Sequence, residues 1–243
     1  MTIWAPGLAA GVAAAAGLCA YGVFDPNAPL FGSVIGRGPG AGASIYLTFD
    51  DGPNPTATER ILDILSSEGI PATFFQVGRH VARYPQIAHM VAERGQEIGN
   101  HTQNHHKLYA KGPRFIEREL VQAHEAIAAS TGAAIRSFRA PHGLRNPFVH
   151  SIARRMKYDV FGWTLGVWDT DRPGVEEIRR RVRVGLRPGA IVLLHDGDGY
   201  DPVGDRTQTA AALLPILRDA RDNGYSVCPL SDLAPRAIAE HRA

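Results

Sequence analysis

Leu47-Thr48-Phe49-Asp50-Asp51-Gly52-Pro53 is the stretch from which the fold of this chain follows. The apolar run 45–49 favours a strand, and the Gly-Pro pair ends that strand in a turn. On a rigid strand Asp50 and Asp51 would point to opposite faces, but where a strand passes into a loop both can face one cleft. One carboxylate could then bind a metal while the other moves a proton. The alternative is a solvated Asp-Gly turn.

Strand-like and helix-like stretches alternate along the rest of the chain, with no internal repeat. Strands are expected over 44–49, 72–77, 97–99, 136–140, 158–164, 190–194 and 225–228. Helices are expected over 56–67, 86–94, 115–130, 147–156, 175–184 and 208–223. Apolar, β-branched strands that alternate with helices predict an α/β fold with a mostly parallel sheet. Closure of that sheet into a barrel is a further inference.

Polar residues that can carry chemistry come just after the predicted strands. They are Asp50, His101, Arg139, Asp169 and His195. Parallel strands bring their carboxyl ends to one edge of a sheet or barrel, where the active sites of α/β proteins lie. This clustering favours an active site over a solvated turn.

His101-Thr102-Gln103-Asn104-His105 places two imidazoles four residues apart. In one helical turn both would point the same way and could share a cation. The alternative is a polar loop with surface histidines. Asp51 would supply a third ligand, and two histidines with one carboxylate leave positions open for water and substrate. His106 is an extra or substitute ligand of second choice.

Two further residues offer acid–base chemistry. Arg139 ends a predicted strand, where it either pairs with a carboxylate or remains an ordinary surface arginine. His195 follows the apolar run 190–194 and enters a Gly-rich loop, which suits a general acid or base. The alternative for His195 is a hydrogen-bonded core histidine.

Taken together, four segments resemble the motifs of the polysaccharide deacetylases, the family with the NodB-type domain that is also called carbohydrate esterase family 4. In chain order they are Thr48-Phe49-Asp50-Asp51-Gly52-Pro53, His101-Thr102-x-x-His105, Arg139-x-Pro141 and Leu193-Leu194-His195. The resemblance covers about residues 44–233 and implies a distorted (β/α)7-type barrel. It also implies metal-dependent hydrolysis of N-acetyl groups on the amino sugars of a cell-wall or related polysaccharide.

Other readings stay open beside this one. The same metal site would serve an ester, such as an O-acetyl sugar, or a formamido or lipid-linked sugar. A non-catalytic carbohydrate-binding wall protein is a third reading, although a binding module has no need for Asp50 and His195 together.

The resemblance implies the metal centre and the base. Asp50 corresponds to the family's general base. Asp51, His101 and His105 correspond to its metal ligands, and the resemblance implies a divalent cation, Zn²⁺ in first place with Co²⁺ and Ni²⁺ as alternatives.

The remaining roles are implied in the same way. His195 resembles the general acid and Arg139 the arginine that holds the base. The backbone N–H of His142 stands where the family has its oxyanion donor. Asp169 corresponds to the acid that orients the catalytic histidine, in a segment that matches the family's Asp-x-x-Asp-Trp motif only in part.

Substrate choice is expected to lie in two loops, 104–113 and 197–206. Trp163 and Trp168 form either a wall that stacks on sugars or part of the core.

The N-terminal stretch 3–24 is uncharged, apolar and long enough to span a bilayer. It predicts an apolar helix over 1–24 that is a transmembrane anchor, with a cleaved signal segment as the alternative and a buried soluble helix as the third choice. A Gly- and Pro-rich linker is expected over 25–42 and the catalytic domain over 43–243. That domain is expected to be extracytoplasmic, either membrane-anchored or secreted.

The formal net charge of +2 is too small to predict a nucleic-acid partner. The family resemblance implies an N-acetylated glycan as substrate, the N-terminal segment predicts a membrane partner, and the chain is expected to be a monomer.

Overall fold

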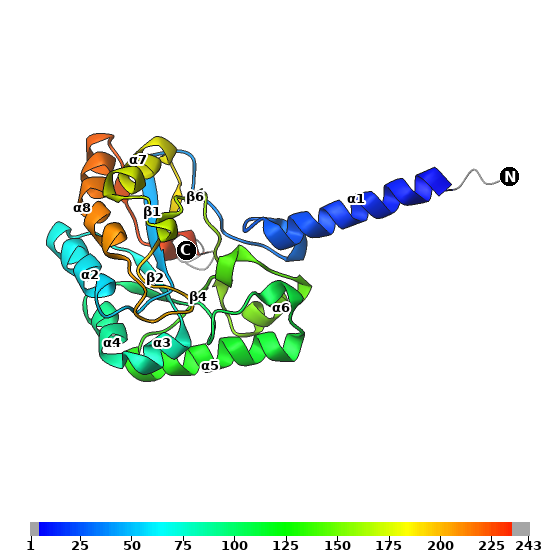
Figure 1. Cartoon of the computed structure of the whole chain (residues 1–243), viewed down its shortest axis with the longest axis horizontal. Coiled ribbons are helices and arrows are strands. Elements are labelled where there is room, and N and C mark those ends of the chain that lie inside the picture. The colour runs from blue at the N-terminus through cyan, green and yellow to red at the C-terminus, as the bar shows by residue number, and fades with distance from the viewer. Residues whose placement is uncertain (1–4, 235–243) are drawn as a thin grey trace, which may run out of the picture.

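The computed structural model describes residues 5–234. In it, helices surround a sheet of parallel strands (Figure 1). The strands are β1 (Ser44–Asp50), β2 (Thr73–Gln76), β3 (Glu97–Asn100), β4 (Ser137–Phe138), β5 (Asp159–Val160), β6 (Leu165–Gly166), β7 (Ile191–His195) and β8 (Ser226–Val227). Their order is β5-β4-β3-β2-β1-β7-β6, with β8 paired to β1, and every pair is parallel. The path ends at β5 and at β6, so the sheet is an open half-barrel. The predicted α/β fold with a parallel sheet is confirmed.

Strand β1 is buried on both faces along almost its whole length, as a central strand of a parallel sheet should be. Ile45, Leu47 and Phe49 belong to the main apolar core under the helices, whereas Tyr46 belongs to a second cluster inside the half-barrel. Side chains alternate along a strand, so Asp50 shares the inner face with Tyr46. The strand therefore delivers the Asp50 carboxylate to the interior at its carboxyl end.

The helices cover the outside of the sheet with one apolar face each. They are α2 (Ala57–Glu68), α3 (Gly78–Arg83), α4 (Pro85–Glu93), α5 (Pro113–Thr131), α6 (Pro147–Arg155), α7 (Val175–Gly185) and α8 (Thr207–Asp222). In α5, for example, Ile116, Leu120 and Ile127 are buried, which is the spacing of one helix face. The short helix α3 was not expected from the sequence; the other six match predicted helices.

One predicted strand is wrong in its extent. The sequence predicts a strand over 158–164, but the structure has β5 at the start of this range and β6 just beyond its end. The two lie at opposite edges of the sheet, where β5 pairs with β4 and β6 pairs with β7. Residues 161–164 therefore cross the open side of the half-barrel, and local propensity carries no sign of that crossing.

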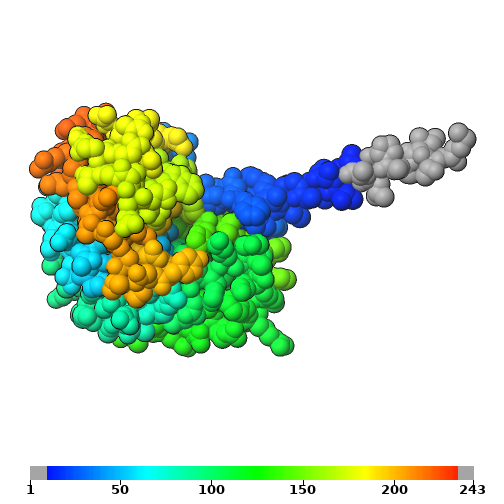
Figure 2. Space-filling model, in the orientation of Figure 1, coloured from blue at the N-terminus to red at the C-terminus, as the bar shows by residue number. Residues whose placement is uncertain are grey.

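The N-terminal helix α1 (Ala5–Phe24) projects away from the body (Figures 1 and 2). Within residues 5–234 the structure contains no helix whose length and apolar character would let it cross a membrane. The expected transmembrane anchor, and the membrane partner expected with it, are therefore not supported. Residues 1–4 of the predicted segment lie outside the described residues.

Candidate active site and metal centre

The carboxyl ends of the strands open into a cavity of about 460 Å³. Its lining residues are Asp50, Asp51, His101, His105, His142, Trp163, Gly166, Val167, Trp168, Thr170, Leu193, His195, Asp198, Gly199, Tyr200 and Arg206. Six residues singled out from the sequence as site residues thus share one cavity. The other two, Arg139 and Asp169, are buried and contact lining residues from behind.

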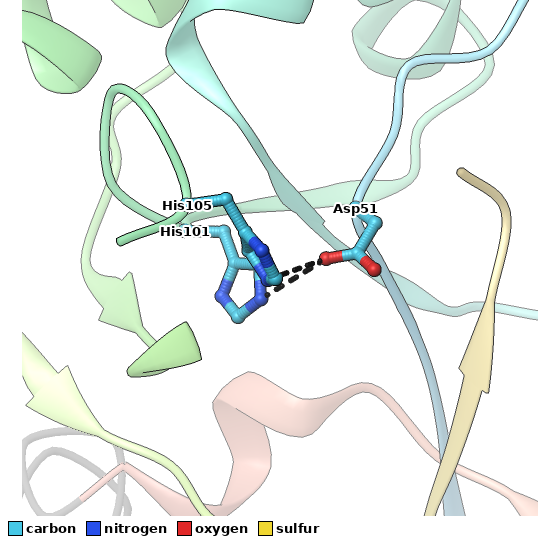
Figure 3. Close-up of side chains that lie close together, drawn as sticks. All are labelled: Asp51, His101 and His105. Atoms are coloured by element: carbon cyan, nitrogen blue, oxygen red, sulfur yellow. Dashed lines mark ion pairs between the residues drawn. The ribbon is translucent and has the colours of Figure 1, made fainter. Parts of the chain in front are cut away.

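Asp51, His101 and His105 form the cluster that could hold a metal ion (Figure 3). One ligand atom of each lies within 4.8 Å of the others, and all three residues are buried. Asp51 Oδ1 is 2.9 Å from His105 Nε2 and 3.4 Å from His101 Nε2. Two imidazole nitrogens and one carboxylate oxygen that converge in this way match the donor set of a catalytic zinc site.

The two histidines do not lie on one helical turn, which corrects the geometry expected from their spacing. Residues 101–105 form a loop in which Thr102 and His105 have positive φ angles of 69° and 58°. Left-handed residues of this kind reverse the chain locally. Thr102 Oγ1 accepts a hydrogen bond from the N–H of His105 at 3.1 Å, which ties the loop together. The two rings still meet, with centroids 5.0 Å apart.

The hydrogen bonding and charge of these residues suit them to bind a cation. His101 Nδ1 lies 2.8 Å from the carbonyl oxygen of Arg139, so Nε2 is the nitrogen that faces Asp51. Asp51 Oδ1 is buried and makes no hydrogen bond of good geometry, as expected of an oxygen directed at an ion. Burial alone would raise the pKa of the Asp51 carboxyl, but the two imidazoles hold that pKa well below its ordinary value. Asp51 is therefore ionised, as a ligand must be.

Asp50 is held by Arg139 on the side away from the cavity. Arg139 is fully buried, and its NH1 group donates to Asp50 Oδ1 at 2.7 Å and to Thr48 Oγ1 at 2.8 Å. Its guanidinium lies over the Phe75 ring, 4.2 Å from the centroid. A buried charged hydrogen bond of this kind fixes the orientation of the carboxylate. The second oxygen, Oδ2, faces His101 Nε2 at 3.6 Å.

His195 is paired with Asp169 at the edge of the same cavity. Its Nδ1 lies 2.8 Å from Asp169 Oδ1, and its backbone N–H donates to Asp169 Oδ2 at 2.9 Å. Thr209 Oγ1 donates to the same oxygen at 2.8 Å. Burial disfavours the imidazolium, but the Asp169 carboxylate outweighs burial and raises the pKa of His195 to about 9. The imidazole is therefore protonated at neutral pH.

His142 lines the cavity from the turn that follows β4. Its φ angle is 56° within the short turn Pro141–Gly143, and its Nε2 lies 3.0 Å from the hydroxyl oxygen of Tyr200. Burial, with His105 close by, lowers the pKa of His142 to about 4, so this imidazole is neutral. A neutral ring can stand beside the cluster without repelling a cation. His106, the second-choice ligand, is exposed, packs on Phe115, and does not belong to the cluster.

Tyr200 lines the cavity but was not predicted as a site residue. The two loops expected to select the substrate contribute unequally to the cavity lining. Loop 197–206 supplies four lining residues, whereas among the described residues of 104–113 the lining includes His105 alone. Arg206 holds the first loop by donating to the carbonyl oxygen of Gly197 at 2.7 Å and to Asp198 Oδ2 at 2.9 Å. The only sequence signal for Tyr200 is its place in a Gly- and Asp-rich loop after His195.

A second missed group is Asp196, next to His195 in the chain. Its carboxylate accepts a hydrogen bond from Thr58 Oγ1 at 2.6 Å, and burial raises its pKa to about 7. A Cβ placed on Gly52 would come within 2.1 Å of Asp196 Oδ2, so only glycine fits there. The turn after β7 thereby packs tightly on the turn after β1 and holds Asp51 in place.

Comparison with known proteins identifies relatives of this chain. A family model described as polysaccharide deacetylase matches residues 37–161. A chitooligosaccharide deacetylase of Sinorhizobium fredii is 38% identical over 195 residues, which cover 77% of this chain and 91% of that protein. A peptidoglycan-N-acetylglucosamine deacetylase of Bacillus cereus is 37% identical over 193 residues, which cover 78% of this chain and 87% of that protein.

A solved structure with the same fold is that of a CE4 family pseudoenzyme from Bacillus anthracis. It has a TM-score of 0.77 and 29% identity, and the match covers 83% of this chain and 68% of that one. A protein described as a pseudoenzyme can therefore share this fold. The fold alone does not establish activity, which depends on the side chains in the cavity.

Proposed function

Because this chain belongs to the polysaccharide deacetylase family, we propose that it is a hydrolase that removes N-acetyl groups from the amino sugars of a glycan. The observation that carries the proposal is the cavity in which a metal-ligand cluster, a restrained carboxylate and a protonated histidine meet. A carbohydrate-binding module needs a shaped surface, but it does not need this combination of an acid and a base. Hydrolysis of an amide needs both.

Asp51, His101 and His105 would hold a divalent cation, and Zn²⁺ suits two imidazoles and one carboxylate best, with Co²⁺ and Ni²⁺ as alternatives. When bound, such a cation supplies Lewis-acid activation of water and of the amide carbonyl. The three side chains are buried and line the cavity, so a substrate in the cavity would meet a cation bound there.

Asp50 is the general base in this proposal. Arg139 occupies Oδ1 and leaves Oδ2 directed toward the cluster, where it can accept a proton from the attacking water. The backbone N–H of His142, in the turn after β4, would donate to the oxygen that gains negative charge. Arg139 restrains the Asp50 carboxylate before the reaction, so this carboxylate needs little rearrangement.

His195 is the general acid. An amine is a poor leaving group unless its nitrogen is protonated, and the pKa of about 9 keeps the His195 imidazole charged before the step. Asp169 binds Nδ1, so Nε2 is the nitrogen that can reach the cavity and give its proton to the departing nitrogen. Asp169 thus both orients and charges the acid.

The mouth of the cavity favours a sugar. Trp168 and Tyr200 line it and remain 71% and 56% exposed, and flat exposed rings suit the apolar faces of pyranoses. One relative is named for chitooligosaccharides and another for peptidoglycan N-acetylglucosamine, which makes N-acetylglucosamine units the first substrates to try. A cell-wall substrate would place the reaction outside the cytoplasm.

Identification of the released acid on defined substrates tests this proposal. The purified chain is supplied with zinc and incubated with N-acetylated chitooligosaccharides, peptidoglycan, O-acetylated xylan and an N-formylated amino sugar. Release of acetate from the amide substrates at the highest kcat/KM is the expected result. Faster release from xylan, or of formate, would instead assign the site to an ester or a formamide. Sugar binding without release from any substrate would favour a non-catalytic carbohydrate-binding protein.

A further inference from the structure

The segment between α1 and β1 lies against the open side of the half-barrel. We refer to residues 25–38 as the N-terminal strap; Figure 1 shows the chain after α1 running back along the body toward β1. The N–H of Ile35 donates to Val160 O at 2.9 Å, and the N–H of Gly162 donates to Ile35 O at 3.0 Å. The N–H of Gly38 donates to Gly189 O at 2.8 Å. The strap therefore connects the β5 edge of the sheet to the chain just before β7.

Asn27 is the strap residue that contacts the wall of the catalytic cavity. Its Nδ2 donates to the carbonyl oxygen of Trp163 at 2.8 Å. Its Oδ1 packs so closely on Gly36 and Gly162 that a Cβ on either would lie within 2.2 Å of it. Trp163 lines the cavity, so the hydrogen bond from Asn27 fixes the backbone that carries this part of the wall.

Neighbouring contacts hold Asn27 in this position. The NH2 group of Arg145, a buried residue, donates to the carbonyl oxygen of Ala28 at 2.8 Å. The N–H of Asn27 donates to Asp25 Oδ1 at 2.7 Å. A Cβ on Gly143 would come within 2.7 Å of both Pro26 and the Trp163 ring, so strap and wall also meet beside His142. The strap is thus built into the body of the protein.

The contacts continue from the wall to the base. The N–H of Gly162 donates to Ile35 O of the strap, and the carbonyl oxygen of Gly162 accepts a hydrogen bond from Arg139 NH2 at 2.9 Å. The other end of the same guanidinium holds Asp50 at 2.7 Å. A single residue, Gly162, therefore stands between the strap and the arginine that restrains the carboxylate.

We propose that Asn27 is a positioning residue for the catalytic cavity: it fixes Gly162 and Trp163, and through them the Trp163 wall and the Arg139–Asp50 pair. This inference rests on the proposed function, because it concerns the same cavity. It also extends the catalytic apparatus to a residue that precedes the region matched by the family model, residues 37–161.

The test compares full-length Asn27→Asp and Asn27→Ala with the wild type and with Ser33→Ala, an exposed position on the same strap. Asn27→Asp keeps the shape of the side chain and removes the donor, so it serves if Asn27→Ala fails to fold. Misplaced catalytic groups lose rate steeply, so we expect both variants to lower kcat/KM for acetate release about tenfold. The Asn27 variants should bind as much zinc as the wild type, since Asn27 does not contact the cluster. Ser33→Ala should match the wild type throughout.

A second readout does not depend on activity. With 5-fluorotryptophan incorporated, the ¹⁹F resonance of Trp163, assigned through Trp163→Phe, should shift in both Asn27 variants and stay in place in Ser33→Ala. A lower Tm with an unmoved resonance and a kcat/KM within about twofold of wild type would overturn the proposal, because Asn27 would then serve stability alone. If the wild type itself releases no acetate, the proposed function fails. The ¹⁹F shift then still tests whether Asn27 positions Trp163.

Discussion

Asp50 and His195 are register partners across the parallel strands β1 and β7. Each is the last residue of its strand, and pairs before them, such as Tyr46 with Ile191, face the interior of the half-barrel. The proposed base and the proposed acid therefore leave neighbouring strands at the same level and on the same face. A slip of one residue in this register would turn one of them toward the helices, so strand pairing itself sets the acid–base geometry.

The pH dependence of activity should report the pairing of His195 with Asp169. The general acid works only when protonated, so kcat/KM should fall as pH rises through the raised pKa of about 9. In Asp169→Asn that pKa should return toward the ordinary value of about 6.5, and the loss at pH 8 should then be roughly thirtyfold. A pH–rate profile measures this. Asp171→Asn, an exposed neighbour on the same turn, is the control, and an unchanged alkaline limb in Asp169→Asn would contradict the assignment.

Stability should depend on pH through the same pair. The pKa of His195 is higher in the folded chain than the ordinary value, so the pairing contributes its full stability below about pH 6.5 and loses it as pH rises through the folded pKa. The Tm of the wild type should therefore fall over this interval, and the fall should be smaller in Asp169→Asn. Parallel thermal melts of the two proteins isolate the pair from other titrating groups. Equal slopes would show that Asp169 does not stabilise the imidazolium.

Substitution of Asp50 should reduce catalysis without reducing metal binding. We expect Asp50→Asn to lower turnover by at least about a hundredfold while the metal content stays at the wild-type level, because Asp50 is not a ligand. His101→Ala should lose both activity and metal. Elemental analysis beside acetate assays distinguishes the two outcomes, with His106→Ala at the exposed neighbouring histidine as control. A near-normal rate in Asp50→Asn would rule out its role as the base.

Sugar recognition should weaken when Trp168 is removed. Its ring is 71% exposed at the cavity mouth, so Trp168→Ala should leave Tm unchanged but raise KM for chitooligosaccharides about tenfold. Trp168→Phe retains a flat ring and should recover most of the affinity. Comparison of KM among the wild type, Trp168→Ala and Trp168→Phe tests whether the ring binds the sugar. An unchanged KM in Trp168→Ala would mean that the indole does not stack on the substrate.

The ends of the long strands could be predicted from the sequence because composition and turn residues both mark them. Phe49 before two acids and a Gly-Pro turn, and an apolar run before His195, place the chemistry where parallel strands finish. The shorter strands carry too few residues for such a signal: β4 and β5 have two each. Their positions depend on pairing with distant neighbours, which local propensity does not encode.

The geometry of the site was less predictable than its residues. His101 and His105 meet through a loop with left-handed residues, a conformation that spacing alone does not reveal. Tyr200 reaches the site from a loop fixed by Arg206, and Asn27 from a segment whose composition suggested a linker. These placements depend on hydrogen bonds between residues far apart in the chain. Motif order therefore predicted side chains that the structure brings together in one cavity, but not the walls around them.

Acetate release from N-acetylated chitooligosaccharides by the metal-free and reconstituted chain tests the central claim most directly. Removal of metal with a chelator should abolish release, and zinc should restore it in the wild type. In His101→Ala zinc should restore nothing, because the Asp51–His101–His105 cluster is broken. Undiminished release by the metal-free wild type, or full zinc rescue of His101→Ala, would show that this cluster does not hold a catalytic metal.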